Sequence, residues 1–301
     1  MQVDMHIHTV ESDGTFTPEE IIKRGLKNNV TAIAITDHDT VAGIEEGIKF
    51  SNELGMEFIP GIEISCNEEN LEVHILGYYL NLDDAKFIRE IDELKKERET
   101  RNFKIIENFK KIGIIIDEEK LKKNAPGNII SRLHFAKYLV SEGIVKSKDE
   151  AFIRYLGKNG LAYEPKENFP PERAVKIISD NGGFVSLAHP FLITPDVDLL
   201  DKLIERLKPY GLDALEAQYS SFSKTQIKSL KRIAKKHGLI ITGGSDFHGS
   251  NRTGIDIGCG GLEYQQLELI KEKLKLKRRN VYDYSYRCCR NDRKCSCLEI
   301  K

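Results

Sequence analysis

The chain lacks an excess of charge of either sign. Its 301 residues include 46 Lys and Arg against 47 Asp and Glu, which gives a formal net charge of −1 at pH 7. Proteins that bind long nucleic acids or anionic membranes over a broad surface carry a strong positive excess. The balance argues against both classes, although it leaves room for a local basic groove.

Long apolar runs are also absent. No stretch approaches the roughly 18 residues that a transmembrane helix needs. The opening residues include Asp4 and His6, where a signal peptide would carry a basic and then an apolar segment. Cys66 and Cys259 are isolated and the other four cysteines fall within the last fourteen residues, so the spacing does not predict a disulfide framework. We therefore expect a cytoplasmic protein.

What the chain does have is enough apolar material for a core, because 40% hydrophobic and 31% charged residues exclude a largely disordered protein. The signals of helices, such as the Thr cap, Pro and acids of Thr17-Pro18-Glu19-Glu20, alternate with those of short buried strands. This alternation predicts an α/β fold with a mostly parallel sheet or barrel. The predicted strands are residues 2–8, 31–36, 58–65, 72–79, 184–188, 214–217 and 239–242.

The strand–helix alternation is interrupted between residues 84 and 164, where apolar residues recur at helical spacing among dense Lys and Glu. We predict a helical insertion over 84–164, within a discontinuous domain made of residues 1–83 and 165–285. The tail, residues 286–301, is basic and rich in cysteine. Neither of its cysteine pairs has the two-residue gap of a zinc knuckle, so we predict a disordered terminus rather than a metal site.

The histidines are placed unevenly. Six of the eight lie at or just past predicted strand ends, beside acids or glycines: His6, His8, His38, His74, His189 and His248. In βα architectures, ligands and chemistry gather at the carboxyl ends of strands. Imidazoles with carboxylates suit divalent ions such as Mn²⁺, Fe²⁺ and Zn²⁺, and Asp13 and Glu63 supply further oxygen atoms. The constellation predicts a metal cluster.

These motifs resemble those of the PHP (polymerase and histidinol phosphatase) family. The matching motifs are His6-x-His8, Thr36-Asp37-His38-Asp39, Gly61-Ile62-Glu63, Val73-His74, Ala188-His189-Pro190 and Ser245-Asp246-Phe247-His248. The resemblance implies a metal-dependent phosphoesterase on a distorted (β/α)7 barrel with an inserted helical subdomain. Ser12-Asp13-Gly14 and the insertion resemble the subgroup that acts on nucleotides with three metal ions.

By that resemblance, one metal ion would bind His6, His8, Glu63 and Asp246. A second would share Glu63 and add His74 and His189, and a third would bind Asp13, His38 and His248. We expect three divalent ions, Mn²⁺ first, with Fe²⁺, Zn²⁺ or Mg²⁺ as alternatives. Metals at these positions would activate a water as hydroxide and clamp the attacking and leaving oxygens.

Substrate contacts are expected from cationic residues outside the metal motifs. Arg132 and His134 lie at the start of a predicted helix in the insertion, whose N-terminus favours anions. They resemble an Arg-x-His stretch that faces the active site in the nucleotide-acting subgroup, and this resemblance makes them candidates for binding the phosphate and the leaving group. Lys158 and Arg252 are weaker candidates. Glu63, Asp246, Arg132 and His134 therefore form the predicted catalytic set.

The leading hypothesis is hydrolysis of phosphate monoesters of small nucleotides: nucleoside monophosphates or 3′,5′-bisphosphonucleotides, with short RNA degraded from its 5′ end as an extension. One alternative is a histidinol-phosphate phosphatase, which Asp13 and the long insertion disfavour. The other is a non-catalytic metal-binding module, which the complete set of nine ligand positions disfavours. The expected partner is a small phosphorylated molecule, with no membrane and no long nucleic-acid track.

Overall fold

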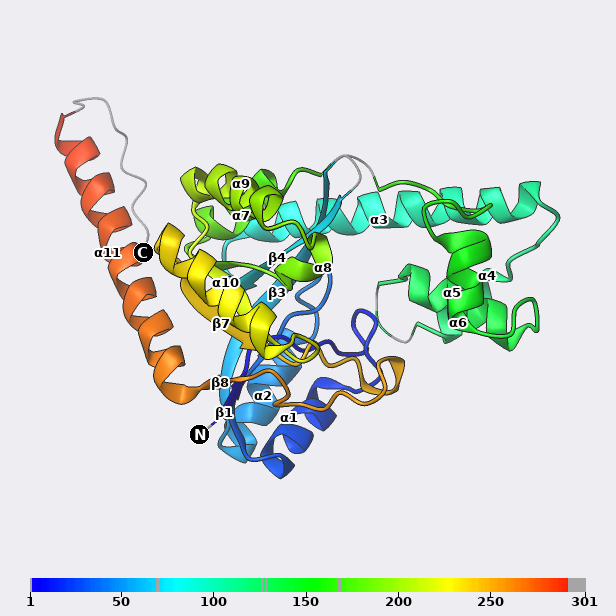
Figure 1. The fold of residues 1–301 in the computed structure, drawn as a ribbon, viewed down its shortest axis with the longest axis horizontal. Coiled ribbons are helices and arrows are strands. Elements are labelled where there is room, and N and C mark those ends of the chain that lie inside the picture. The colour runs from blue at the N-terminus through cyan, green and yellow to red at the C-terminus, as the bar shows by residue number, and fades with distance from the viewer. Residues whose placement is uncertain (1, 69–70, 126, 128, 167–168, 292–301) are drawn as a thin grey trace.

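The computed structural model describes residues 2–68, 71–125, 127, 129–166 and 169–291, with side chains up to Arg278 (Figure 1). One sheet runs through the centre in the order β7-β6-β5-β4-β3-β2-β1-β8. Its strands are β1 Gln2–Asp4, β2 Val30–Ile35, β3 Glu57–Glu68, β4 Leu71–Tyr78, β5 Phe184–Leu187, β6 Ala214–Tyr219, β7 Ile240–Gly244 and β8 Leu262–Glu263. The seven predicted strands are confirmed as β1–β7, and the two-residue β8 is added antiparallel to β1.

The sheet curls into a nearly closed barrel, because the chain that follows β1 pairs with the chain that follows β7. Ile7 forms a parallel bridge with Phe247, and the Asp246 N–H donates to the His6 carbonyl at 2.8 Å. The approach requires glycine at position 244, where a Cβ would lie 2.5 Å from the His6 nitrogen. Residues 6–8 and 246–248 are thereby held side by side at one end of the barrel.

The predicted strand over residues 2–8 is shorter in the structure. The regular ladder ends at Asp4, whose buried carboxylate accepts the backbone N–H groups of His6 at 3.2 Å and Ser245 at 2.9 Å. Its other oxygen accepts the Gly258 N–H at 2.7 Å. A side chain thus takes up backbone donors that a continued strand would have paired, and of residues 5–8 only Ile7 forms a β-bridge.

The sheet is parallel except around β4 and β8. β4 runs antiparallel to both β3 and β5, with Ser65 opposite His74 in the β3–β4 hairpin. The sequence analysis predicted His74 at a strand end. In the structure it lies within β4 instead. The reversed direction brings the first half of β4 to the same barrel end as the last residues of β3.

Helices cover the outer face and one end of the barrel (Figure 1). The helices of the barrel are α1 Pro18–Lys27, α2 Ile44–Leu54, α7 Pro171–Asp180, α8 Pro190–Ile193, α9 Val197–Leu207, α10 Lys224–His237 and α11 Tyr264–Asn291, with short 3-10 turns η2 Lys208–Tyr210 and η3 Gly249–Asn251. α1 begins with the predicted cap, in which Thr17 and Glu20 exchange hydrogen bonds. Lys273, Lys277 and Arg278 of α11 donate to backbone carbonyls that precede β6 and β5 and follow β4, so α11 covers the barrel end opposite the histidines.

Between β4 and α7 the chain forms α3 Ala85–Lys111, α4 Glu118–Lys123, α5 Arg132–Ser141, α6 Lys148–Ala151 and the π-helical turn η1 Phe152–Leu156. α3 is shared between two cores. Phe87, Ile91 and Leu94 pack in the barrel cluster, whereas Ile105 and Phe109 pack in a separate cluster with α5 and η1. The inserted helices therefore have a hydrophobic core of their own. The domain division at residues 84 and 164 stays a prediction.

The structure describes only the first part of the predicted tail, residues 286–291. α11 continues to Asn291, past the proposed tail start at residue 286, and residues 292–301 lie outside the described residues. Among the residues that the structure describes, no helix combines the length and apolarity needed to cross a bilayer.

A separate core for the insertion leads to a stability prediction. Phe135 is fully buried in that core, and Phe135→Ala should destabilise it by about 3–5 kcal/mol. Hydrogen exchange should then show lost protection in α5 and the end of α3, with protection of β1–β7 unchanged. Phe103→Ala, on the exposed face of α3, is the control and should cost less than about 0.5 kcal/mol. Equal loss of protection in the barrel strands would contradict a separate core.

Candidate metal centre and substrate cavity

The nine predicted metal ligands meet at one end of the barrel. The segment after β1 supplies His6, His8 and Asp13, and the loop after β2 supplies His38. Glu63 and His74 lie in β3 and β4, His189 follows β5, and Asp246 and His248 follow β7. Residues 240 positions apart in the chain are thus brought into contact, since His6 Nε2 lies 3.3 Å from Asp246 Oδ1.

Glu63 lies at the centre of the cluster and is 1% exposed. Its Oε1 lies 3.0 Å from His189 Nε2, 3.1 Å from His74 Nδ1 and 3.4 Å from His6 Nε2. Its Oε2 lies 3.0 Å from His38 Nδ1 and 3.3 Å from His8 Nε2. Burial by itself would raise the pKa of Glu63, but the surrounding imidazoles, His38 and His6 foremost, hold this pKa well below its usual range. The carboxylate is therefore ionised and its two oxygens face different histidines.

The two other carboxylates flank Glu63. Asp246 Oδ1 lies 3.2 Å from His8 Nε2 and 3.3 Å from His6 Nε2. Asp13 Oδ1 lies 3.2 Å from His248 Nε2, with His8 Nδ1 at 3.8 Å and His38 Nε2 at 4.0 Å. Each carboxylate thus shares at least two imidazoles with its neighbours.

The ligand atoms fall into overlapping groups within 4.8 Å, which resemble the predicted partition but are not identical to it. His6, His8 and Asp246 form one group, as predicted for the first ion. Asp13, His38 and His248 form another, which also includes His8. His74 Nδ1 and His189 Nε2 lie 3.3 Å apart and share Glu63 Oε1, although the groups also join His189 to His6 and His74 to His38 through Glu63.

Several buried atoms of the cluster have no hydrogen-bond partner among the described residues. They include His6 Nε2, His8 Nε2 and Asp13 Oδ1. Buried polar atoms in proteins are nearly always paired, so these three atoms call for a further group. Lone pairs of imidazoles and carboxylates that converge on one space suit a divalent cation. The residues present therefore fit bound metal ions.

A buried carboxylate that the sequence analysis missed supports two of the histidines. Glu216, in β6, contacts His6 Nδ1 with Oε1 at 2.9 Å and accepts the His189 backbone N–H with Oε2 at 2.7 Å. The first contact fixes the imidazole with its proton on Nδ1, which leaves the Nε2 lone pair of His6 facing Glu63 and Asp246. The second holds His189 in a sparsely populated backbone conformation, with φ at 24°.

The aspartates on either side of His38 bind different partners. Asp37 accepts the Thr9 N–H and hydroxyl, both at 2.7 Å, and the Ser12 hydroxyl at 2.5 Å. Ser12 in turn lies 3.4 Å from His8 Nδ1. Asp39 accepts the Ser65 N–H at 2.8 Å and an N–H of Arg98 from the insertion. The first aspartate thus orders the loop behind His8, and the second ties the cluster to α3.

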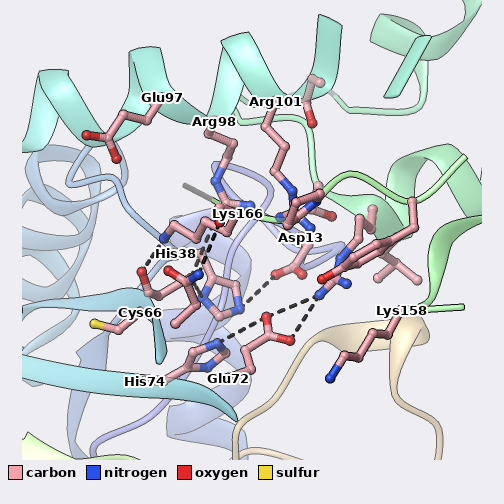
Figure 2. Close-up of a pocket in the computed structure, with 18 of the residues that line it drawn as sticks. Asp13, His38, Cys66, Glu72, His74, Glu97, Arg98, Arg101, Lys158 and Lys166 are labelled. Carbon is pink, nitrogen blue, oxygen red and sulfur yellow. Dashed lines mark hydrogen bonds and ion pairs between the residues drawn. The ribbon is translucent and has the colours of Figure 1, made fainter. Parts of the chain in front are cut away.

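A cavity of about 440 Å³ opens beside the cluster, between the barrel and the insertion. Asp13, His38 and His74 lie at its inner end, and Arg98 and Arg101 extend into it from α3 (Figure 2). Its cationic residues are Arg98, Arg101, Arg132, Lys158 and Lys166. Leu133, Phe152 and Tyr163 add apolar and aromatic surface. The cavity is thus suited to an anionic molecule with an apolar part.

Of the four residues predicted to contact the substrate, two line the cavity and two do not. Arg132 and Lys158 line the cavity. The Arg132 Nη2 donates to both carboxylate oxygens of Glu72, at 3.0 and 3.2 Å, and Glu72 Oε1 lies 3.6 Å from His74 Nε2. Arg132 is therefore linked to the metal cluster through one carboxylate.

His134 and Arg252 are not among the residues that line the cavity. His134 Nδ1 accepts the Ser131 N–H at 2.9 Å and so caps α5. Burial lowers the pKa of His134 to about 4, which keeps the ring neutral at pH 7 with its proton on Nε2. Arg252 donates to Asp246 Oδ2 at 2.5 Å and to the Tyr219 hydroxyl at 2.8 Å, so it orients a carboxylate of the cluster.

The sequence analysis missed Glu72, Arg98, Arg101, Lys166 and Glu216. A signal existed for Glu216, because it is an acid within the apolar run Ala214-Leu215-Glu216-Ala217. Arg98 and Arg101 belong to a stretch so dense in charge that it reads as a solvated helix face. Only their position opposite the barrel distinguishes them from the exposed charges of α3.

The chain is similar in sequence and in fold to known proteins. The profile of the PHP domain matches residues 4–153. A 5′-3′ exoribonuclease of Haemophilus influenzae is 35% identical over 268 residues, which cover 89% of this chain and 94% of that protein. A 3′,5′-nucleoside bisphosphate phosphatase of Chromobacterium violaceum is 31% identical over 264 residues, covering 85% and 90% of the two chains. A Bifidobacterium adolescentis structure assigned as a metal-dependent phosphoesterase superposes with a TM-score of 0.79 at 26% identity, covering 89% of this chain and 94% of that one.

The contacts of Glu216 generate a prediction about metal affinity. Glu216→Gln can accept only one of the two N–H groups, so we expect His6 or the His189 backbone to lose its fixed orientation. Apparent affinity for Mn²⁺ should fall about 10- to 100-fold, measured by equilibrium dialysis with elemental analysis. Glu263→Gln, on the exposed edge strand β8, is the matched control and should bind Mn²⁺ like the wild type. Unchanged affinity in Glu216→Gln would exclude a supporting role for this carboxylate.

Proposed function

This chain belongs to the PHP domain family, and we propose that it is a metal-dependent hydrolase of the phosphate esters of small nucleotides. The observation that carries the proposal is the position of the Glu63 cluster, with its unpaired buried ligand atoms, at the inner end of a cation-lined cavity. Phosphoester hydrolysis needs both parts, because a nucleophile must be generated and a negatively charged group must be bound next to it.

We propose that three divalent ions, with Mn²⁺ as the first candidate, bind the nine residues named above. One would bind His6, His8, Glu63 and Asp246, one Glu63, His74 and His189, and one Asp13, His38 and His248. Bound divalent cations lower the pKa of a coordinated water and neutralise phosphate charge. Three carboxylates for three divalent ions leave a net positive centre, which favours a phosphate ligand. The overlap of the ligand groups around Glu63 and His8 supports closely spaced ions.

The protein's own groups would bind and orient the ester. Arg132 reaches the cavity beside Glu72 and offers its guanidinium to phosphate oxygens. His134 is neutral at pH 7 and, with Nδ1 occupied by the Ser131 N–H, can donate only from Nε2. Because it caps α5 and does not line the cavity, His134 would support the wall that carries Arg132 rather than give up a proton to the leaving oxygen. Arg252 and the Tyr219 hydroxyl hold Asp246 in place by donating to its Oδ2, the oxygen that does not contact the histidines.

Nucleotides are the substrate class that the cavity supports best. Its volume of about 440 Å³ lies within the range of small-molecule sites, and its wall joins cations to Phe152, Tyr163 and Leu133. A nucleotide has the matching combination of phosphate and a flat apolar base. The relatives that are an exoribonuclease and a nucleoside bisphosphate phosphatase support the same class. We include the 5′ end of short RNA, because a few nucleotides at an open cavity require no long basic track.

A phosphate-release screen with added Mn²⁺ tests the proposal. The panel is nucleoside monophosphates, nucleoside 3′,5′-bisphosphates, short 5′-phosphorylated RNA and histidinol phosphate, with nucleotide products followed by chromatography. We expect turnover of at least one nucleotide substrate and its loss on chelation. Turnover of histidinol phosphate alone would replace the proposed substrate class, and no turnover of any ester by the metal-loaded protein would favour a non-catalytic role.

Replacement of the central carboxylate should reduce both turnover and metal binding. Glu63→Gln halves the acceptor capacity at the centre of the cluster, so kcat should fall at least about 100-fold, or roughly 2.7 kcal/mol. Bound Mn²⁺ per chain should also decrease, as measured by elemental analysis after dialysis. Glu53→Gln, exposed on α2, should match the wild type in both measurements. Wild-type turnover in Glu63→Gln at saturating Mn²⁺ would remove Glu63 from the reaction centre.

Arg132 should contribute to substrate binding without contributing to metal binding. Arg132→Ala should retain the wild-type metal content, while kcat/KM for a nucleotide falls about 10- to 100-fold from the loss of a charged hydrogen bond. Arg132→Lys should restore only part of the activity, because an ammonium group cannot reproduce the planar guanidinium. An aryl phosphate with fewer contacts should lose less activity. Joint loss of metal and of all activities would show that Arg132 is structural.

A further inference from the structure

Asp13 is held differently from the other predicted metal ligands. The others lie in a strand, or close to a strand end or a β-bridge. Asp13 lies in the turn over residues 10–13, beyond the bridge that Ile7 forms with Phe247. A turn outside the ladder keeps its position only through the contacts that its own residues make with their surroundings. The contacts of this loop, residues 9–15, therefore decide whether the Asp13 carboxylate stays within reach of the cluster.

Within the barrel, the short turn η3 holds the loop. Asn251 Nδ2 donates to the Asp13 carbonyl at 2.6 Å, and the Ser250 N–H donates to the Thr15 hydroxyl at 2.9 Å. η3 directly follows His248, whose Nε2 lies 3.2 Å from Asp13 Oδ1. One turn thus fixes both the backbone of Asp13 and the imidazole that faces its carboxylate.

The inserted helices reach the same turn and the same loop. Lys148, the first residue of α6, donates from Nζ to the Asn251 carbonyl at 3.2 Å. Gly127, between α4 and α5, lies so close to the loop that a Cβ there would collide with the backbone of Val10 and Glu11. The loop that carries Asp13 is therefore held by both parts of the fold.

The helix that carries Lys148 does not explain its contact with Asn251. A cation in the first turn of a helix opposes the helix dipole, and no carboxylate of the described residues forms an ion pair with Lys148. Burial lowers the pKa of Lys137 in α5, the positive charge of Lys148 lowers it further, and the negative charge of Asp13 acts in the opposite direction. Lys148 and Asp13 thus influence the same group, so the ammonium lies in the neighbourhood of the metal ligand.

The third ion is the one proposed at Asp13, His38 and His248. The geometry points to Lys148 and Asn251 as positioning residues through which the insertion sets the affinity for this ion. The inference rests on the proposed function for the identity of the ion. Without Lys148 the loop would lose one of its ties, and the third ion would lose a fixed oxygen ligand. The other two ions would keep their ligands, which lie in or beside the strands. A merely structural tie would change folding stability and leave the three affinities in their original ratio.

Metal binding by a Lys148 variant tests the inference. Lys148→Met keeps an unbranched chain and removes the ammonium. In equilibrium dialysis with elemental analysis, we expect one Mn²⁺ per chain to bind about 10- to 100-fold more weakly, with the other two unchanged. Charge alone predicts the opposite sign, because removing a cation near Asp13 favours a divalent ion. Lys148→Arg can still donate to the carbonyl and should restore most of the affinity. Lys146→Met, exposed and two residues earlier, is the matched control and should match the wild type.

Two further measurements address the path through η3. Asn251→Ala should weaken the same ion, and the double variant should lose at most about twofold more than the weaker-binding single variant, because both residues act through one series of contacts. In the chelator-treated, metal-free protein, hydrogen exchange of residues 9–15 should be faster in Lys148→Met than in the wild type or Lys146→Met. Turnover that Lys148→Met loses at limiting Mn²⁺ should return at excess Mn²⁺.

The opposite results are equally clear. Unchanged or tighter Mn²⁺ binding by Lys148→Met, equal weakening of all three ions, or wild-type exchange of residues 9–15 would overturn the inference while leaving the proposed function intact. Binding of only two ions by the wild type would remove the third site and the inference with it. If the wild type hydrolyses no ester, the proposed function fails, and the dialysis and exchange measurements alone decide for or against the positioning role.

Discussion

A single buried carboxylate surrounded by imidazoles is the constraint on which the rest of the structure depends. Glu63 contacts five histidines from four different segments of the chain within 3.4 Å. Such a cluster is stable only if its charges are balanced and its rings are held by other groups, because burying it unpaired would cost several kcal/mol. The barrel closure at residues 6–8 and 246–248, the Glu216 contacts and the Arg252–Asp246 pair all serve this requirement.

The insertion also contributes to the charge balance of the cluster, from the opposite wall of the cavity. α3 begins as a barrel helix, packed through Phe87 and Leu94, and continues as the wall that carries Arg98 and Arg101. Arg98 neutralises a carboxylate next to the cluster, whereas Arg101 has no carboxylate within ion-pair distance among the described residues. On the proposed function, chemistry and recognition would be divided between the two parts of the fold: the barrel would hold the reacting end of a substrate, and the helical wall would hold what extends beyond it.

The sequence was sufficient for the strands and for the nine cluster residues as a set, because both are encoded by local patterns. His6-x-His8 lies on one extended segment, and Asp246 and His248 follow an apolar run. His74 was correctly predicted to join the cluster, but its position in the fold was not. It reaches the cluster from within an antiparallel strand and not from a strand end. Glu216 and Arg101 were missed, since an isolated acid in a strand and an arginine in a charged helix become distinctive only through their neighbours.

The sequence by itself determined the α/β barrel, the existence of a helical insertion and the residue types of a metal cluster, because periodicity and short motifs act over a few residues. Tertiary structure alone decided which atoms meet. It brought Glu216 of β6 into contact with His6, turned Arg252 toward Asp246 and left Arg101 at the cavity with no carboxylate within ion-pair distance among the described residues. These outcomes depend on contacts between residues far apart in the chain, whose distances and charges are set only when the barrel closes and the insertion packs against it.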